Sequence, residues 1–375
     1  MHQATASNGQ RTTSHKKQSI CLCMIVKDEA KVIERCLRSV HDLVDYWVIS
    51  DTGSTDGTQE LIRKTLEGVP GELLQEDWVD FGHNRTLNIQ HAFGKADYIL
   101  LIDADMVVER DGDLPELTAD SYMLRHSGDL EYRIKRLVKG DIKWRYVGST
   151  HEYLTTDDRD RAVNLDALII DHFADGGSRG DKFERDARLL RAELDRDPGN
   201  SRAVFYLAQT MRDMGDAREA LELYDRRAGM GDWPEEVYYS LLQAGILRAE
   251  SGDWPGAMDT LTRAWEYRPQ RLEACYELAS RLREMGRNQA AYAFARAGLN
   301  RREPDDWLFV QPWVYTWGLL FEYSIAAYWA GDLRGSLEAC DRLLAMPDLP
   351  DPFRKQTRAN REFAVRAVAE ARSRA

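Results

Sequence analysis

The chain has 375 residues, a formal net charge of −12 at pH 7 and 43% hydrophobic residues. This length is enough for two domains that each bury a core of their own. The acidic balance argues against a nucleic-acid-binding protein, which would need a basic face, but it does not exclude a local cationic patch for an anionic ligand.

Residues 1–18 are polar, and we expect them to form a disordered tail without a signal peptide. The five cysteines are an odd number without a CxxC pair, and Cys21 and Cys23 fall on the same side of a predicted strand. This usage predicts reduced structural thiols and a cytoplasmic location. Residues 307–330 are rich in Trp, but Gln311, Pro312 and Glu322 interrupt them, so we expect a buried helix or an interface rather than a membrane span.

Strands and helices alternate in the first half of the chain. We predict strands over residues 19–26, 46–51, 73–79 and 98–103 and helices over residues 30–40 and from Thr58, which Thr55 or Asp56 can cap. A loop that carries Arg85, followed by a helix to Phe93, connects the third strand to the fourth. Such alternation predicts an α/β fold with a mostly parallel sheet, helices on both faces, and a ligand site beyond the carboxyl ends of the strands.

Beyond about residue 180 the strand signal ends and a helical repeat begins. Glycines mark the repeat with spacings of 37, 34 and 45 residues, and small residues stand seven before and five after each glycine. The glycines are Gly215, Gly252, Gly286 and Gly331; the small residues are Ala208, Gly245, Ala279 and Ser324 before them and Ala220, Ala257, Ala291 and Ser336 after them. The pattern predicts pairs of close-packed helices joined at the glycine, with an insertion around residues 301–312. We therefore predict domains at residues 19–180 and 181–375.

Two carboxylates follow the apolar run of residues 100–102. Asp103 and Asp105 are spaced i, i+2, so we expect them to project from the same side at the end of the strand. Two hard oxygen ligands at the carboxyl end of a buried strand suit a divalent cation that bridges to phosphate oxygens. The structural alternative is that strands end in Asp because turns favour it.

Other charged residues end the neighbouring strands. Lys27 follows the first strand, Asp51 ends the second and Arg85 follows the third. Brought to one edge of the sheet with Asp103 and Asp105, they form a site in which the acids hold a ribose or base and a metal, and Arg85 pairs with a diphosphate. This combination predicts a nucleotide-diphosphate ligand, although Lys27 and Arg85 also fit ordinary surface positions.

The motifs together carry a family resemblance. They are residues 22–29 (LCMIVKDE), 50–58 (SDTGSTDGT), 80–85 (DFGHNR) and the DXD motif at 103–105. With them, residues 19–175 resemble a family 2 glycosyltransferase of the GT-A fold, and the repeats resemble a tetratricopeptide-repeat (TPR) solenoid. The resemblance implies that Asp51 holds the nucleoside of the donor, that Asp103 lies near the ribose, and that Asp105 ligates Mg²⁺ or Mn²⁺.

Two later segments extend the resemblance. Residues 148–153 (GSTHEY) lie where the fold places its acceptor loop and catalytic base, which implies Glu152 as the base, with His151 as a substrate-binding neighbour. The apolar run at 169–170 leads to His172, which the resemblance implies as a metal or phosphate ligand. The family more often has Asp at the base position. A surface acid at Glu152 and ordinary histidines at the other two positions are the structural alternatives.

The resemblance implies an inverting, metal-dependent transferase that uses a nucleotide-diphosphate sugar, with uridine as the usual nucleoside. The combination of domains resembles bacterial enzymes that glycosylate Cys or Ser of bacteriocin peptides and others that modify flagellin, which implies a peptide or protein acceptor. Two alternatives stay open. The acceptor is a small metabolite or a lipid-linked glycan and the repeats serve a homodimer, or the transferase domain is degenerate and the repeats act as a scaffold.

Overall fold

The computed structural model describes residues 18–127, 132–176, 182–306 and 308–374. The chain forms two compact units, Met1–Leu189 and Leu190–Ala375. Their boundary falls inside helix α4 (Lys182–Arg196). Except for Gln18, the predicted N-terminal tail lies outside the described residues.

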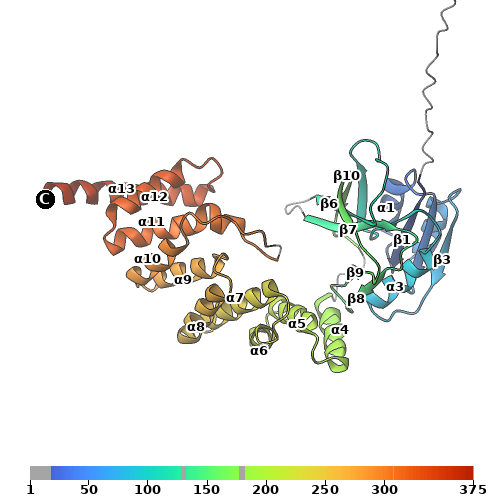
Figure 1. The fold of residues 1–375 in the computed structure, drawn as a ribbon, viewed down its shortest axis with the longest axis horizontal. Coiled ribbons are helices and arrows are strands. Elements are labelled where there is room, and N and C mark those ends of the chain that lie inside the picture. Colours follow the sequence, from blue (N-terminus) through green and yellow to red (C-terminus); the bar gives the residue numbers. More distant parts are fainter. Residues whose placement is uncertain (1–17, 128–131, 177–181, 307, 375) are drawn as a thin grey trace, which may run out of the picture. The chain divides into compact units, whose positions relative to one another are not determined.

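An eight-stranded sheet forms the first unit, in the order β3-β2-β1-β4-β7-β6-β10-β5, and β8 and β9 form a small second sheet (Figure 1). The strands are β1 (Ile20–Val26), β2 (Tyr46–Asp51), β3 (Gly71–Gln75), β4 (Tyr98–Leu101), β5 (Met106–Arg110), β6 (Ser121–Ser127), β7 (Tyr132–Lys139), β8 (Arg145–Val147), β9 (Tyr153–Thr155) and β10 (Ala162–His172). Strands β1 to β4 run parallel, as the alternating pattern predicts. Beyond them β7 and β5 are antiparallel to their neighbours, a feature that the alternation did not reveal.

Helices cover both faces of the parallel half. Along β1, Leu22 and Met24 belong to a core that includes α1 (Ile33–Val40) and α2 (Thr58–Thr65). Cys21 and Cys23 point to the other face, into a core that includes α3 (Phe81–Ala92). Burial on both faces is the reason that these strands are continuous apolar runs rather than alternating ones.

Several predicted boundaries shift in this unit, among them the end of β4, at Leu101 rather than at residue 103. Helix α1 begins at Ile33 rather than at residue 30, and β3 ends at Gln75 rather than at residue 79. The prediction that Arg85 lies in a loop was wrong, because α3 begins at Phe81, where the Asp80 side chain accepts a hydrogen bond from the backbone N–H of His83. A side-chain cap five residues upstream, at Asp80, therefore places Arg85 inside the helix.

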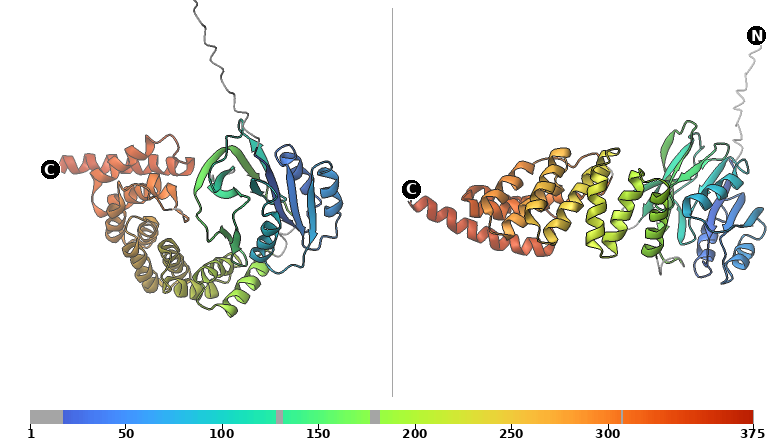
Figure 2. Two further views of the ribbon diagram at one scale, coloured as in Figure 1. Left: turned by 45° about the vertical axis from the view of Figure 1, so that its right-hand side comes forward. Right: turned by 90° about the horizontal axis from the view of Figure 1, so that it is seen from below.

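The second unit is helical, as predicted. Its helices after α4 are α5 (Ser201–Asp213), α6 (Ala217–Ala228), α7 (Pro234–Glu250), α8 (Trp254–Tyr267), α9 (Glu273–Glu284), α10 (Asn288–Gly298), the π-helix η2 (Val314–Gly318), α11 (Leu319–Ala330), α12 (Leu333–Leu344) and α13 (Asp351–Arg374). Successive helices stack as hairpins (Figure 2). The four marker glycines lie in the turns α5–α6, α7–α8, α9–α10 and α11–α12, all with positive φ between 73° and 92°, which favours glycine.

The small residues of the repeat permit close helix contact, as the spacing predicts. A Cβ atom added to Gly245 of α7 would lie 2.6 Å from the Leu261 side chain of α8. In the last pair, Ser336 Oγ donates to the carbonyl of Ser324, 2.7 Å away, across the helix interface. These contacts confirm the helix–turn–helix repeat that the sequence indicates.

The predicted insertion lies between α10 and η2 and is anchored by a buried cation. Arg271, which is fully buried, pairs with Glu273 at 3.0 Å and with Asp306 at 3.3 Å. Its guanidinium also donates to the carbonyls of Leu308 and Phe309. Because this charge is hydrogen-bonded on every side, the insertion is held firmly against the helices instead of forming a free loop.

Most of the predicted Trp-rich segment packs inside this unit. Trp313 contacts Tyr276 and Trp317 at ring-centroid distances of 4.7 and 5.3 Å, whereas the Trp329 side chain is 65% exposed. Among the described residues, no helix combines the length and the apolar character that a bilayer crossing requires. The five cysteines are buried and free, and burial raises the pKa of Cys21 to about 12, as expected for structural thiols.

Candidate active site

The carboxyl ends of β1, β2 and β4 meet at one edge of the sheet, where Val26 pairs with Asp51. Asp51 is 1% exposed, and its Oδ1 accepts hydrogen bonds from the backbone N–H groups of Gly53 and Ser54 and from the Gln59 side chain. Its Oδ2 is buried and has no hydrogen-bond partner among the described residues. A buried, oriented acceptor of this kind suits an N–H or O–H donor of a ligand.

Arg85 joins two acids that are far apart in the sequence. Its Nη2 donates to Asp103 Oδ1 at 2.6 Å, and its Nε lies 2.7 Å from Glu152 Oε1. Burial by itself would raise the pKa of Asp103, but the guanidinium groups of Arg85 and Arg136 lower it well below the usual range. Asp103 is therefore ionised at neutral pH.

A tight loop between β8 and β9 carries Glu152 to Arg85. Gly148 has a φ of 103°, and its carbonyl packs so closely on α3 that a Cβ atom at Gly82 would lie 2.1 Å from the oxygen. The carbonyl of Ser149 accepts the backbone N–H of Phe81 at 3.0 Å. The start of α3 and the Glu152 loop thus fix each other, with glycine needed on both sides of the contact.

Two residues at this site, Arg136 on β7 and His126 on β6, were not predicted from the sequence. Arg136 Nη1 lies 3.5 Å from Asp103 Oδ2, and its Nε donates to His126 Nε2 at 3.4 Å. Burial first, and then the Arg136 charge, lower the pKa of His126 to about 4, so this imidazole is neutral at pH 7. The signal available in the sequence was a charged residue directly before the apolar pair Leu137–Val138.

Asp105 and His172 meet through strand pairing rather than through sequence proximity. His172 ends β10 and pairs with Met106, the first residue of β5, which places His172 Nε2 3.2 Å from Asp105 Oδ2. The strand alternation predicted for Asp103 and Asp105 does not apply, because β4 ends at Leu101 and both acids lie in the connection to β5.

A carboxylate and an imidazole at this distance fit a divalent cation that also takes phosphate and water oxygens, as Mg²⁺ commonly does. Among the described residues no cluster of three or more acidic, His or Cys side chains could hold a metal ion by protein ligands alone. The donor set therefore fits a metal that arrives with a phosphate ligand better than a closed structural site.

The two remaining predicted residues are exposed. Lys27 lies in the bend after β1, and no ion pair joins it to the strand-end acids in the part of the chain that the structure describes. His151 has a left-handed backbone conformation with a φ of 52°, next to Glu152. The structure brings together Arg85, Asp103 and Glu152, and separately Asp105 and His172.

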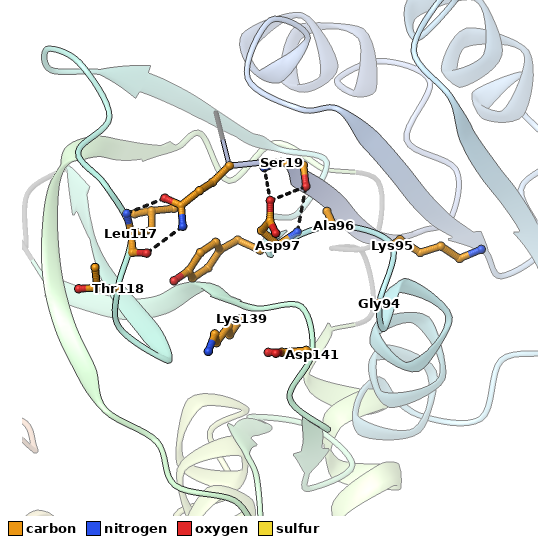
Figure 3. Close-up of a pocket in the computed structure, with 11 residues that line it drawn as sticks. Ser19, Gly94, Lys95, Ala96, Asp97, Leu117, Thr118, Lys139 and Asp141 are labelled. Atoms are coloured by element: carbon orange, nitrogen blue, oxygen red, sulfur yellow. Dashed lines mark hydrogen bonds between the residues drawn. The ribbon is translucent and has the colours of Figure 1, made fainter. Parts of the chain in front are cut away.

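A cavity of about 610 Å³ lies at the opposite edge of the sheet, where β1 and β4 begin (Figure 3). Its polar groups largely bond to one another, since Asp97 accepts from both the backbone N–H and the hydroxyl of Ser19 and the Gln18 amide pairs with the backbone of Leu117. Lys139 and Asp141 complete its rim (Figure 3). It is not the site of the strand-end acids, which stand at the other ends of the same strands.

Comparison with known families identifies the class of most of the first unit. Residues 21–161 match the model of the family described as Glycosyl transferase family 2. This part of the chain is a family 2 glycosyltransferase domain. The match includes Asp51, Arg85, Asp103, Asp105 and Glu152 and ends before His172.

Of two curated relatives, one is named a TPR repeat-containing protein and the other a glycosyltransferase. The chain is 28% identical over 304 residues to the TPR repeat-containing protein Synpcc7942_0270 of Synechococcus elongatus, with 74% of each chain covered. It is 24% identical over 217 residues to the SPbeta prophage-derived glycosyltransferase SunS of Bacillus subtilis, with 53% of this chain and 50% of SunS covered. The alignment thus spans half the length of SunS.

Solved TPR structures resemble the chain only loosely. A structure of MamA matches with a TM-score of 0.35 and 17% identity, covering 44% of this chain and 81% of MamA. A structure of YrrB, described as a TPR protein with an unusual peptide-binding site, matches with a TM-score of 0.35 and 13% identity, covering 50% and 84%. The TPR-like character of the second unit rests on its helix pairs and turn glycines.

Proposed function

We propose that this protein is an inverting, metal-dependent glycosyltransferase that moves a sugar from a nucleotide-diphosphate sugar, with UDP-sugar as the expected donor, to a peptide or protein side chain. The observation that carries the proposal is that Asp51, the Arg85–Asp103 pair and the Asp105–His172 pair all stand at or beyond the carboxyl ends of the strands. In an α/β sheet this is where the ligand binds.

Different residues would bind the nucleoside, the metal and the sugar hydroxyls. Asp51 offers to the nucleoside its buried Oδ2, which accepts no hydrogen bond from the residues that the structure describes. Asp105 and His172 would hold Mg²⁺ or Mn²⁺, which neutralises the negative charge of the diphosphate leaving group. Asp103, kept ionised by Arg85 and Arg136, can accept hydrogen bonds from a ribose or sugar hydroxyl without taking a proton.

Glu152 is the proposed general base. An inverting transfer needs a carboxylate that removes the acceptor proton as the acceptor attacks the anomeric carbon. The ion pair with Arg85 at 2.7 Å holds the Glu152 carboxylate next to Asp103, beside the proposed donor site. That Arg85 also reaches the diphosphate, and that Lys27 and His151 contact the donor, stay predictions.

The helical unit supports a polypeptide acceptor. TPR-like solenoids present extended concave surfaces that bind peptides in other proteins. Joined to a sugar-transfer domain in one chain, such a surface would recruit the acceptor and raise its local concentration near the donor.

Calorimetric titration tests the donor site. Purified full-length protein would be titrated with UDP, GDP and CDP, with Mn²⁺ or with EDTA. We expect one nucleotide to bind only with Mn²⁺ and Asp105→Ala to remove this binding, whereas Asp113→Ala, a matched exposed acid, leaves it intact. Absence of binding across the panel would contradict the proposal.

Mass spectrometry tests the acceptor. The protein, Mn²⁺ and the sugar derivative of the nucleotide that binds would be incubated with a peptide library and, separately, with a metabolite extract. Mass gain on peptides by one sugar residue supports the proposal. Transfer to small molecules alone would leave a glycosyltransferase with a different acceptor class.

A further inference from the structure

The five residues His172–Gly176, here called the wrap segment, enclose the Asp105 carboxylate. His172 Nε2 lies 3.2 Å from Asp105 Oδ2, and the backbone N–H of Phe173 donates to the Asp105 carbonyl at 3.2 Å. At Gly176 the backbone passes so close that an added Cβ atom would lie 3.4 Å from Asp105 Oδ2 and 3.1 Å from Glu29 Oε2. The wrap segment therefore sets the position of His172 relative to Asp105.

Arg35 on helix α1 anchors the wrap segment from outside. Its two terminal nitrogens donate to the two oxygens of Asp175 at 2.9 and 2.6 Å, a bidentate pair. The same guanidinium lies over the Phe173 ring, 4.2 Å from its centroid. One rigid, planar cation thus contacts residues on both sides of Ala174.

Ala174 shows why an anchor is needed. Its φ is 59°, a left-handed conformation that is unfavourable for a residue with a Cβ atom. Such a conformation persists only where surrounding contacts over-determine it, and it is frequent at ligand sites. The contacts of Arg35 with Phe173 and Asp175 supply that constraint.

We propose that Arg35 is a positioning residue of the metal–diphosphate site: by holding Phe173 and Asp175 it keeps the His172 imidazole beside the Asp105 carboxylate. This inference rests on the proposed function, in which Asp105 and His172 hold the metal. Arg35 makes no hydrogen bond to either of these side chains in the described residues, so it holds them through the backbone of the wrap segment, and its charge also acts directly on Asp105.

The test uses full-length protein with Mn²⁺ and UDP as probes. Arg35→Ala is expected to raise the Kd for Mn²⁺-dependent UDP binding about two- to fivefold, the range for a partly exposed ion pair. Arg35→Ala is also expected to speed hydrogen exchange of the amides of residues 173–176 in metal-free protein. The matched control is Arg38→Ala on the same helix, whose partner is Glu34, and it should change neither quantity.

Exchanging the two charges of the Arg35–Asp175 pair gives a more specific test. Asp175→Arg should weaken Mn²⁺-dependent UDP binding as Arg35→Ala does, and the double variant Arg35→Asp with Asp175→Arg should recover part of the loss. Unchanged exchange of residues 173–176 in Arg35→Ala, or no rescue in the double variant, would overturn the proposal. If the wild type binds no nucleotide with Mn²⁺, the proposed function fails first, and the exchange measurement in metal-free protein still shows whether Arg35 holds the wrap segment.

Discussion

Arg85 of α3 donates from Nη2 to Asp103 at 2.6 Å and stands 2.7 Å from Glu152 through Nε, so one guanidinium links the acid that follows β4 to the acid between β8 and β9. The three side chains are 16, 26 and 15% exposed. Partial burial makes the link stronger than a surface ion pair, because water screens it less and each carboxylate would be costly without its cation.

We expect Arg85→Met to lower the free energy of unfolding by about 3 kcal/mol, because it leaves two partly buried carboxylates without their cation. Urea unfolding followed by circular dichroism measures this loss. Arg63→Met on the exposed face of α2 is the control. Addition of Asp103→Asn to Arg85→Met should recover part of the loss, and a loss below about 1 kcal/mol in the single variant would show that the link contributes little.

For Glu152→Gln, we expect kcat to fall about 100-fold or more while UDP binding with Mn²⁺ is kept, because the amide cannot take the acceptor proton. Glu152→Asp should retain part of the activity, since it keeps a carboxylate near Arg85. Turnover and calorimetry on the same preparations separate the two effects. A Gln variant with wild-type kcat would remove Glu152 from the chemistry and direct the search to another base.

Stability should depend on pH through His126. Its pKa is about 4 in the folded state, lowered by burial and by Arg136, against about 6.5 when unfolded. Below pH 6.5 His126 is protonated in the unfolded chain but stays neutral in the folded protein. The free energy of unfolding therefore decreases as the pH is lowered toward about 4. Between pH 7 and pH 5 this decrease is about 2 kcal/mol.

Urea unfolding at pH 7 and pH 5 measures this dependence. In His126→Gln the drop in stability should be smaller than in the wild type by about that amount, whatever other groups contribute. Arg136, Asp103 and His172 are the charged or titratable groups that act on the ring, and all three are unchanged in the variant. Equal drops in the two proteins would show that His126 is protonated as readily in the fold as in the unfolded chain.

The predicted homodimer has a test at Trp329, which is 65% exposed on α11. We expect the wild type to sediment as a dimer and Trp329→Glu to sediment as a monomer, because a large exposed indole is a common centre of an interface. Tyr267→Glu, a change at a 45% exposed aromatic on α8, is the control. A monomeric wild type would contradict the prediction.

The amino-acid sequence by itself determined the local features. The apolar runs of β1 and β2, the helix pairs and the turn glycines follow from periodicity and from the need for positive φ, which depend on near neighbours in the chain. The acid at the end of β2 and the DXD pair were visible for the same reason, since they stand directly after buried strands.

Only the tertiary structure decided which charged groups meet. Arg85 was expected in a loop, but the Asp80 cap starts α3 early and turns Arg85 toward Asp103. Arg136 and His126 reach the site because β7 and β6 join the sheet beside β4, and His172 reaches Asp105 because β10 pairs with β5. Pairing between strands that are distant in the sequence depends on the packing of the whole domain. Short-range periodicity therefore does not predict it.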